Sequence, residues 1–457
     1  MYFAHVTLML IVIIATTTVQ WSTCAPSQDA NDQRPSDADD IFKRQRTFRR
    51  EPPKKFKESK EKSSKLPPVH PPTVFSDTHE PLPKHLQALV DANNNFGFKL
   101  VNSLIKYSGN KNIFIAPLSL FSTLITLYSA SSKQTNDEIV YVLNLQNLDE
   151  DDIQNGFRSL LHNLLYETGP DTTLKILNAL LVDNKVNISK QYTDRIRTYY
   201  NAYLEKVGFS SEPDYVLQWT NQLVSWWTDG LIPTLLTREP HPTTKLLLMN
   251  AIYFKSKWAE VFNPKYTTEK TFTNQDKSES KVPMMLINSK FRMFCDNETL
   301  NFCAVDIPYT GHRMAFTIFL PMNGIDLSFL DKNLNTETLK LTLSSLETRS
   351  LELGLPRMSL NTNYNLHKPL EDLGMKTAFS SDKANFSKIG TNNGQLFVKE
   401  AKHKTVLEVN EEGTVAAAAT YAVIGNRQSP QRLYVNHPFI FIIRDIKTGT
   451  ILFHGRI

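Results

Sequence analysis

The residues with the most distinctive chemistry lie at 411–430, near the C-terminal end of the chain. They read EEGTVAAAATYAVIGNRQSP, and residues 413–426 carry no charged side chain. Small residues occupy alternate positions and would share one face of an extended strand. These residues are Thr414, Ala416, Ala418 and Thr420. Four consecutive alanines would also favour a helix. A strand face made of such small side chains can, however, enter a packed sheet without clashes. The uncharged run ends at Arg427, a side chain that trypsin-like proteases accept in an acidic pocket.

The usual signatures of enzymes do not occur in this sequence. It has no HExxH, Walker loop, GxGxxG or GxSxG. Residues 380–383 (SSDK) and 447–449 (KTG) resemble two β-lactamase motifs, but they stand in the wrong order, and we interpret both as chance. The eleven histidines lack metal-ligand spacing, and three cysteines are too few for a disulfide scaffold. We expect a protein that is not an enzyme and that holds no metal and no cofactor.

Periodicity and composition indicate the elements that must position the 411–430 segment. Helical spacing predicts helices at 85–105, 118–130 and 219–232. Apolar runs predict strands at 174–182, 245–254, 351–361, 406–409 and 439–444. Their irregular alternation without a repeat favours a mixed α/β (α+β) fold with a large sheet. Hydrophobic residues make up 41% of the 457 residues and charged residues 21%, which is typical of a globular protein.

Seven motifs, in chain order, resemble those of one known family. They are NIFIAPLSL (112–120), NAIYFKSKW (250–258), VPMM (282–285), LPRMS (355–359), VNEEGTVAAAA (409–419), HPFIF (437–441) and FHGRI (453–457). Together they resemble the serpins, over about 370 residues from Pro83 to the end. Ala116 stands where the family usually has serine. The resemblance implies the serpin fold, with three β-sheets, eight or nine helices and an exposed reactive-centre loop that serves as protease bait.

The resemblance also implies where the loop is cut. Arg427 lies fourteen residues after Gly413 and eleven before Pro438. Both counts match the family's residue on the acyl side of the scissile bond, so the reactive bond is predicted at Arg427–Gln428. Insertion of the cut loop into a sheet as a new strand would begin at the hinge, Glu411 and Gly413. Gln428 departs from the family's common serine, and Val415 departs from its common hinge glutamate.

Two groups of polar residues acquire expected roles from the same resemblance. Ser119, Asn178 and His403 match a hydrogen-bonded shutter beneath the sheet. Trp258 and Arg357 match the breach where insertion begins, and Arg357 is expected to pair with Glu411. Each group also fits an ordinary role, as satisfied polar core residues or as a surface ion pair.

The N-terminal residues predict export followed by a charged tail. An apolar run at 6–15, before small residues at 22–25, predicts a secretory signal over residues 1–24. An uncleaved anchor is the alternative, because no Lys or Arg precedes the run. Residues 25–84 predict a disordered extension. Within it, residues 42–65 carry eleven Lys or Arg against three Glu, a net charge of +8. This tail would bind sulfated glycans, be processed at residues 49–50, or act as a solvated linker before a serpin domain at 85–457.

If the chain is exported, three sequons could be glycosylated and two cysteines could form a disulfide. Asn187, Asn297 and Asn385 head glycosylation sequons. A predicted hairpin with its tip near Thr299 would place Cys295 opposite Cys303. Either a short disulfide or two buried free thiols would fit that position.

The sequence therefore predicts a secreted, monomeric suicide inhibitor of arginine-specific, trypsin-like serine proteases in an extracellular cascade of the clotting, melanization or immune type. A non-inhibitory carrier or chaperone and a polyanion-controlled inhibitor are the alternatives. The net charge of +5 does not predict nucleic-acid binding. No stretch after residue 24 reaches the ~18 apolar residues that a membrane span needs.

Overall fold

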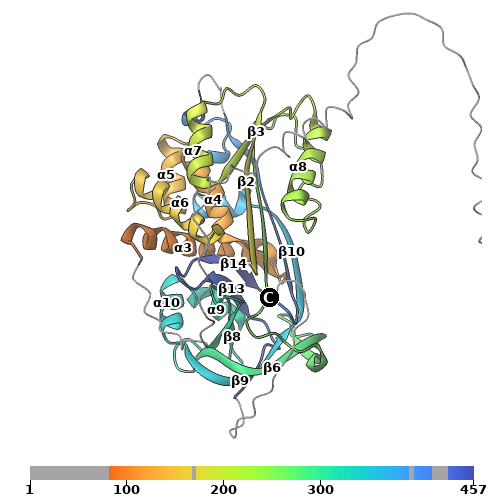
Figure 1. Ribbon diagram of the computed structural model, residues 1–457. Helices are drawn as coiled ribbons and strands as arrows, with labels where there is room; N and C mark the ends of the chain where they lie inside the picture. The colour runs from red at the N-terminus through yellow and green to blue at the C-terminus, as the bar shows by residue number, and fades with distance from the viewer. Residues whose placement is uncertain (1–81, 167–170, 323, 391–395, 414–430) are drawn as a thin grey trace, which may run out of the picture. The chain divides into compact units, whose positions relative to one another are not determined.

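The computed structural model describes residues 82–166, 171–322, 324–390, 396–413 and 431–457. All of them belong to one compact unit, Thr78–Ile457. The expected mixed α/β fold is confirmed: these residues form nine α-helices and two hydrogen-bonded sheets (Figure 1). None of the helices in this described part is long and apolar enough to cross a membrane.

Two of the helices expected from periodicity are confirmed, and a third begins earlier than expected. The helices are α3 (Lys84–Ser108), α4 (Pro117–Tyr128), α5 (Lys133–Val142), α6 (Glu150–Tyr166), α7 (Lys190–Tyr200), α8 (Pro213–Trp227), α9 (Leu327–Asn333), α10 (Thr336–Ser344) and α11 (His367–Leu373). Helix α8 starts six residues before the predicted 219 and ends at Trp227. Pro213 opens it because a proline at the first helical position loses no intrahelical hydrogen bond.

The five-stranded sheet has the order β10-β11-β4-β2-β3. Its strands are β10 (Met358–Asn365), β11 (Val398–Val409), β4 (Leu246–Ser256), β2 (Thr172–Asp183) and β3 (Ala202–Val207). One face packs on α4, which is buried from Pro117 to Leu127. The other face forms a second core cluster with α8. Helices on both faces explain why β2 and β4 read as continuous apolar runs.

The remaining nine strands form one hydrogen-bonded network, so the expected third sheet is not separate. They are β1 (Ile113–Ile115), β14 (Ile451–Arg456), β13 (Ile440–Asp445), β8 (Met314–Pro321), β7 (Phe302–Pro308), β6 (Glu279–Asp296), β9 (Glu347–Pro356), β12 (Gln431–Tyr434) and β5 (Thr268–Thr273). Strand β6 has 18 residues. It pairs first with β5 and β9 and then, at its end, with β7. Two sheets that the resemblance predicts as distinct therefore share one strand.

The single strand predicted at 351–361 is wrong. The chain leaves the nine-stranded sheet at Pro356 and enters the five-stranded sheet as β10 at Met358. Pro356 has no N–H to continue a ladder. Arg357 instead donates its backbone N–H to Pro283 O at 2.8 Å. This break places the Arg357 side chain where the two sheets meet.

Candidate functional site

The central feature is the seam between β4 and β11, two parallel neighbours in the five-stranded sheet. They pair from Val398 with Leu246 to Thr405 with Ile252. The last residues of β11 no longer pair with β4, although β11 still pairs with β10 as far as Val409. The two strands are therefore hydrogen-bonded from the start of each strand to Ile252 and Thr405, and they are unpaired at the end nearest the hinge.

The hinge is held against the chain that leaves β4. A tight turn joins Asn410 to Gly413 through backbone hydrogen bonds in both directions. Trp258 donates its backbone N–H to Glu412 O at 2.9 Å, and Gly413 forms a bridge with Lys257. Gly413 has φ +141°, and a Cβ there would lie 2.3 Å from Ser256 O. Only glycine fits, because the crowding atoms belong to the backbone and φ is positive.

The Glu411 carboxylate is buried beside the hinge and holds two donors. Its Oε1 accepts the Thr267 hydroxyl at 2.6 Å and the Arg357 guanidinium. The expected pairing of Arg357 with Glu411 is therefore present. Burial raises the pKa of Glu411, but the hydrogen bonds from Arg357 and Thr267 outweigh it and leave the pKa below its ordinary value. The carboxylate stays charged and fixes the start of the hinge.

Trp258 packs at the end of the seam that lies beside the hinge. Its side chain is 1% exposed and donates Nε1–H to Asn410 O at 2.9 Å. The indole stacks on Tyr309, with ring centroids 4.6 Å apart. The side chain thus connects the hinge turn to the core of the nine-stranded sheet.

A buried polar cluster crosses the middle of the seam. Asn178, Asn250 and His403 occupy one row, because Asn250 pairs with Asn178 on β2 and with His403 on β11. The Asn250 amide donates to Ser119 Oγ at 2.6 Å and to Asn178 Oδ1 at 2.7 Å. His403 Nδ1 lies 2.8 Å from Asn250 Oδ1. Asn250 therefore joins α4, β2 and β11 at one point.

The hydrogen bonds also fix the protonation state of His403. The Ala116 backbone N–H donates to Nε2 at 3.1 Å, so Nε2 is the acceptor nitrogen. Nδ1 then carries the proton and donates to Asn250. Burial lowers the pKa of His403 to about 3, because the charged ring would have to leave water. The imidazole is neutral, and its bond to Asn250 is a direct side-chain link across the seam.

Sequence reasoning missed several members of these groups. Asn250 is the centre of the polar cluster, Thr123 donates to Asn178 Oδ1 at 3.1 Å, and Thr267 supports Glu411. Asn250 stands first in the NAIYFKSKW motif, between apolar residues of a strand that is buried on both faces. A buried asparagine in such a strand needs partners, and this signal could have identified it. Thr123 and Thr267 carry no comparable signal.

The reactive-bond and loop residues lie outside the described residues. These are Thr414, Ala416, Ala418, Thr420, Arg427 and Gln428. The structure fixes both ends of their segment, at Gly413 beside β4 and at Gln431, where β12 pairs in parallel with β9. Among the described residues there is no group of acidic, His or Cys side chains that could hold a metal ion.

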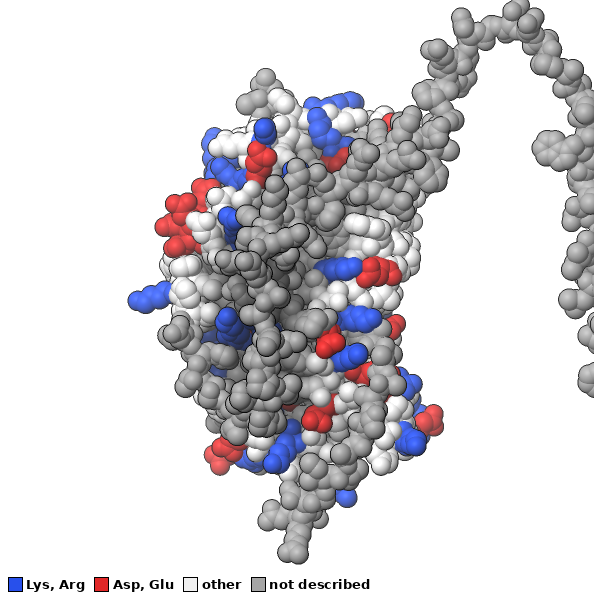
Figure 2. Space-filling view, viewed as in Figure 1, with Lys and Arg blue, Asp and Glu red and all other residues white. Residues whose placement is uncertain are grey.

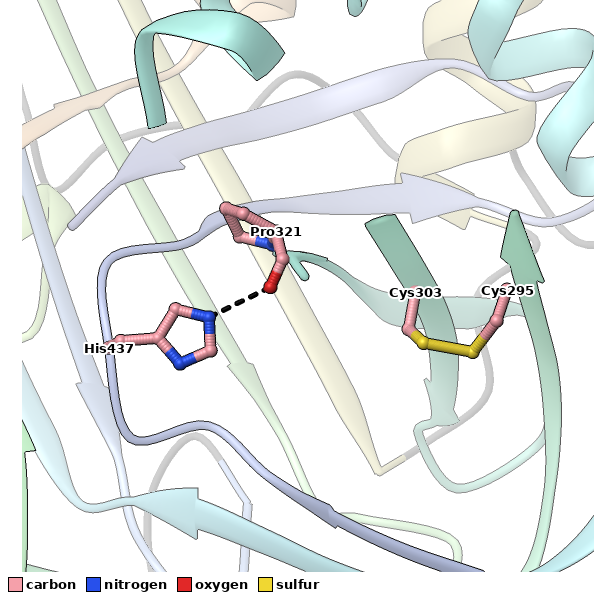
Figure 3. The surroundings of a disulfide bond; sticks show 4 residues. All are labelled: Cys295, Cys303, Pro321 and His437. Atoms are coloured by element: carbon pink, nitrogen blue, oxygen red, sulfur yellow. Dashed lines mark hydrogen bonds between the residues drawn. A yellow bond between two sulfur atoms is a disulfide. The ribbon is translucent and has the colours of Figure 1, made fainter. Parts of the chain in front are cut away.

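Cys295 and Cys303 form a disulfide bond, so the first of the two sequence alternatives holds (Figure 3). The cysteines face each other on β6 and β7. Asn297 is exposed in the turn between these strands, where Asp296 accepts the Thr299 hydroxyl at 2.5 Å. Hydrogen bonds from Thr299 and Glu298 lower the pKa of Asp296 to about 2. Of the other two sequon residues, Asn187 is exposed and Asn385 is half-buried.

The five-stranded sheet with its parallel seam and the nine-stranded network define a mixed α/β class of protein, and solved structures share this fold. Human thyroxine-binding globulin superposes with a TM-score of 0.75 at 27% identity, covering 81% of this chain and 98% of its own.

Sequence comparisons identify the family. Residues 91–457 match the pattern of the family described as serpin (serine protease inhibitor). Human Serpin B8 is 35% identical over 80% of this chain and 98% of its own length. Iripin-8 from Ixodes ricinus is 34% identical over 81% of this chain and 93% of its own. The chain belongs to the serpin family. Members are mostly protease inhibitors rather than catalysts, and they occur both inside and outside cells.

Proposed function

We propose that this chain is a secreted suicide inhibitor of trypsin-like serine proteases, cleaved at Arg427–Gln428. The observation that carries the proposal is the parallel seam between β4 and β11, with the hinge anchored at its open end. The protease supplies the covalent chemistry: its serine attacks the Arg427 carbonyl, the peptide bond to Gln428 breaks and an acyl-enzyme forms. Specificity would come from the guanidinium of Arg427.

After cleavage, the hinge would direct the loop into the seam. The turn at 410–413 reverses the chain, so an inserted segment would run antiparallel to β11 and to β4. Insertion would replace one parallel ladder by two antiparallel ladders, the slightly stronger type. Fourteen residues at ~3.3 Å each would carry the tethered protease roughly 46 Å. Inhibition is then a race between insertion and hydrolysis of the acyl-enzyme.

The polar cluster would act as a latch in this race. An inserted strand separates β4 from β11, so the bond between His403 and Asn250 must be given up. The hinge turn and the Glu411–Arg357 pair sit at the end where separation starts. These residues would hold the intact form closed until the loop is cut.

A denaturing gel after incubation with trypsin tests the proposal. We expect an SDS-stable complex for the intact chain and none for Arg427→Glu. Thr414→Arg should be cleaved without forming the complex, because insertion would bury an unpaired charge. Arg238→Glu, a charge reversal at an exposed arginine between α8 and β4, is the matched control and should behave as wild type. Cleavage of the wild-type chain without a complex, and no gain in heat resistance on cleavage, would favour a non-inhibitory carrier instead.

Secretion would be accompanied by glycosylation, for which Asn187 and Asn297 are better candidates than the half-buried Asn385. Any glycan effect would come from the tail at 42–65. The first turn of α6 is acidic, with Glu150, Asp151 and Asp152, and both signs of charge are interspersed on the visible face (Figure 2). Heparin affinity of the chain with and without residues 25–80 tests this, and equal retention would contradict a role for the tail.

A further inference from the structure

Strand β10 is an unusually unprotected edge of the five-stranded sheet (Figure 1). It pairs with β11 over eight consecutive residues without a bulge. Its sequence, MSLNTNYN, contains no charge and no proline. Natural edge strands usually carry such features, because bare backbone groups attract other strands. The opposite edge, β3, follows the rule: it has only six residues, and Glu205 and Lys206 are exposed on it.

The outer backbone groups of β10 remain unpaired within the described part of the chain. No backbone hydrogen bond there joins residues 359–365 to any strand other than β11. A groove of about 750 Å³ runs along this margin. The end of α3 and the start of α11 contribute to its lining, with Tyr107 and Lys368, and Asn361 and Asn363 line it from β10. The groove thus offers backbone hydrogen-bonding groups between two helical walls.

The charge of the groove is positive. Lys111 and Lys368 line it, and no carboxylate does. Lys368 lies 3.1 Å from Glu371 and is 74% exposed. Lys111 is exposed and has no ion pair among the described residues. An acidic side chain at the end of an extended segment would therefore find a partner in Lys111.

We propose that β10 binds an extended acidic segment of a partner polypeptide, which adds to the sheet as a sixth strand. Main-chain hydrogen bonds would supply affinity, and Lys111 would select an acidic residue. A second copy of this chain fits less well, because each copy would bring its own lysines and its own helical walls to the contact. The surface is separate from the seam, since β11 lies between β10 and β4. The proposal does not depend on the inhibitory function.

The test is fluorescence anisotropy of the full-length intact chain with a labelled ten-residue peptide, in which alternating Thr and Val are flanked by Asp. We expect saturable binding in the micromolar range, as for small transient interfaces. Lys111→Glu should weaken binding at least fivefold. Lys332→Glu, an exposed residue on α9, is the matched control and should leave binding unchanged. No saturable binding, or equal effects of the two substitutions, would overturn the proposal.

Two N-methylated versions of the peptide locate the contact. Each carries methyl groups on one alternate set of amides. Because only every second N–H of an added edge strand faces β10, one version should lose binding at least tenfold and the other should retain it. A strand inserted in the β4–β11 seam would use both sets, so loss of binding by both versions would contradict the edge site. Hydrogen exchange should show protection of residues 359–365 on binding, and protection confined to 246–252 would likewise overturn the proposal.

Discussion

Replacing Gly413 by alanine tests how closely the hinge backbone packs against the end of β4. The new Cβ would lie 2.3 Å from Ser256 O, 2.7 Å from Lys257 Cα and 2.8 Å from Trp258 N. All three are backbone atoms, so no flexible side chain can move aside. The positive φ adds strain of about 1–3 kcal/mol for a residue with a Cβ. Displacing the turn would also weaken the bond from Trp258 N–H to Glu412 O, worth about 1 kcal/mol.

We therefore expect Gly413→Ala to lower the free energy of unfolding by about 3 kcal/mol or more. With ~2.1 cal/mol/K of unfolding entropy per residue and about 370 folded residues, this lowers Tm by roughly 4 °C. Gly449→Ala is the matched control: its φ is +75°, but nothing lies within 4 Å of the added Cβ, so it reports strain alone. Thermal unfolding followed by circular dichroism measures both. Equal shifts for the two variants would refute the crowding argument.

Three further outcomes are expected. Asn250→Ala should cost about 2–4 kcal/mol of unfolding free energy in urea, because it leaves buried partners unsatisfied, whereas the exposed Asn288→Ala should cost little. In the folded chain the pKa of His403 is lowered to about 3, so as the pH falls this histidine is protonated in the unfolded chain before it is protonated in the folded chain. Stability should therefore fall as pH drops from about 6.5 towards 3, by about 1.4 kcal/mol per unit, and the slope should be shallower in His403→Asn. Opening the Cys295–Cys303 bond, with a sequence separation of 8, should cost about 2.5 kcal/mol by loop entropy. A Tm unchanged by reductant, with opening verified by mass spectrometry, would contradict this.

Elements with strong local patterns could be predicted from the sequence. The helix at 85–105 and the buried helix at 118–130 follow from apolar spacing, and the strands at 174–182 and 245–254 follow from short apolar runs. The position of the disulfide hairpin followed from alternation around the turn at 296–299. The break at Arg357 was not predicted, because 351–361 has continuous strand character and the change of sheet depends on distant neighbours.

The sequence by itself determined which segment is small, uncharged and bounded by an arginine, because these are properties of side chains and their spacing. Only the tertiary structure decided that β4 and β11, 152 residues apart at the paired residues Leu246 and Val398, become parallel neighbours. It also decided that Asn250 joins Asn178 to His403, and that Gly413 meets the backbone after β4. The physical reason is that strand pairing and register are set by the packing of the whole sheet, and a local pattern cannot state which partner a strand will find.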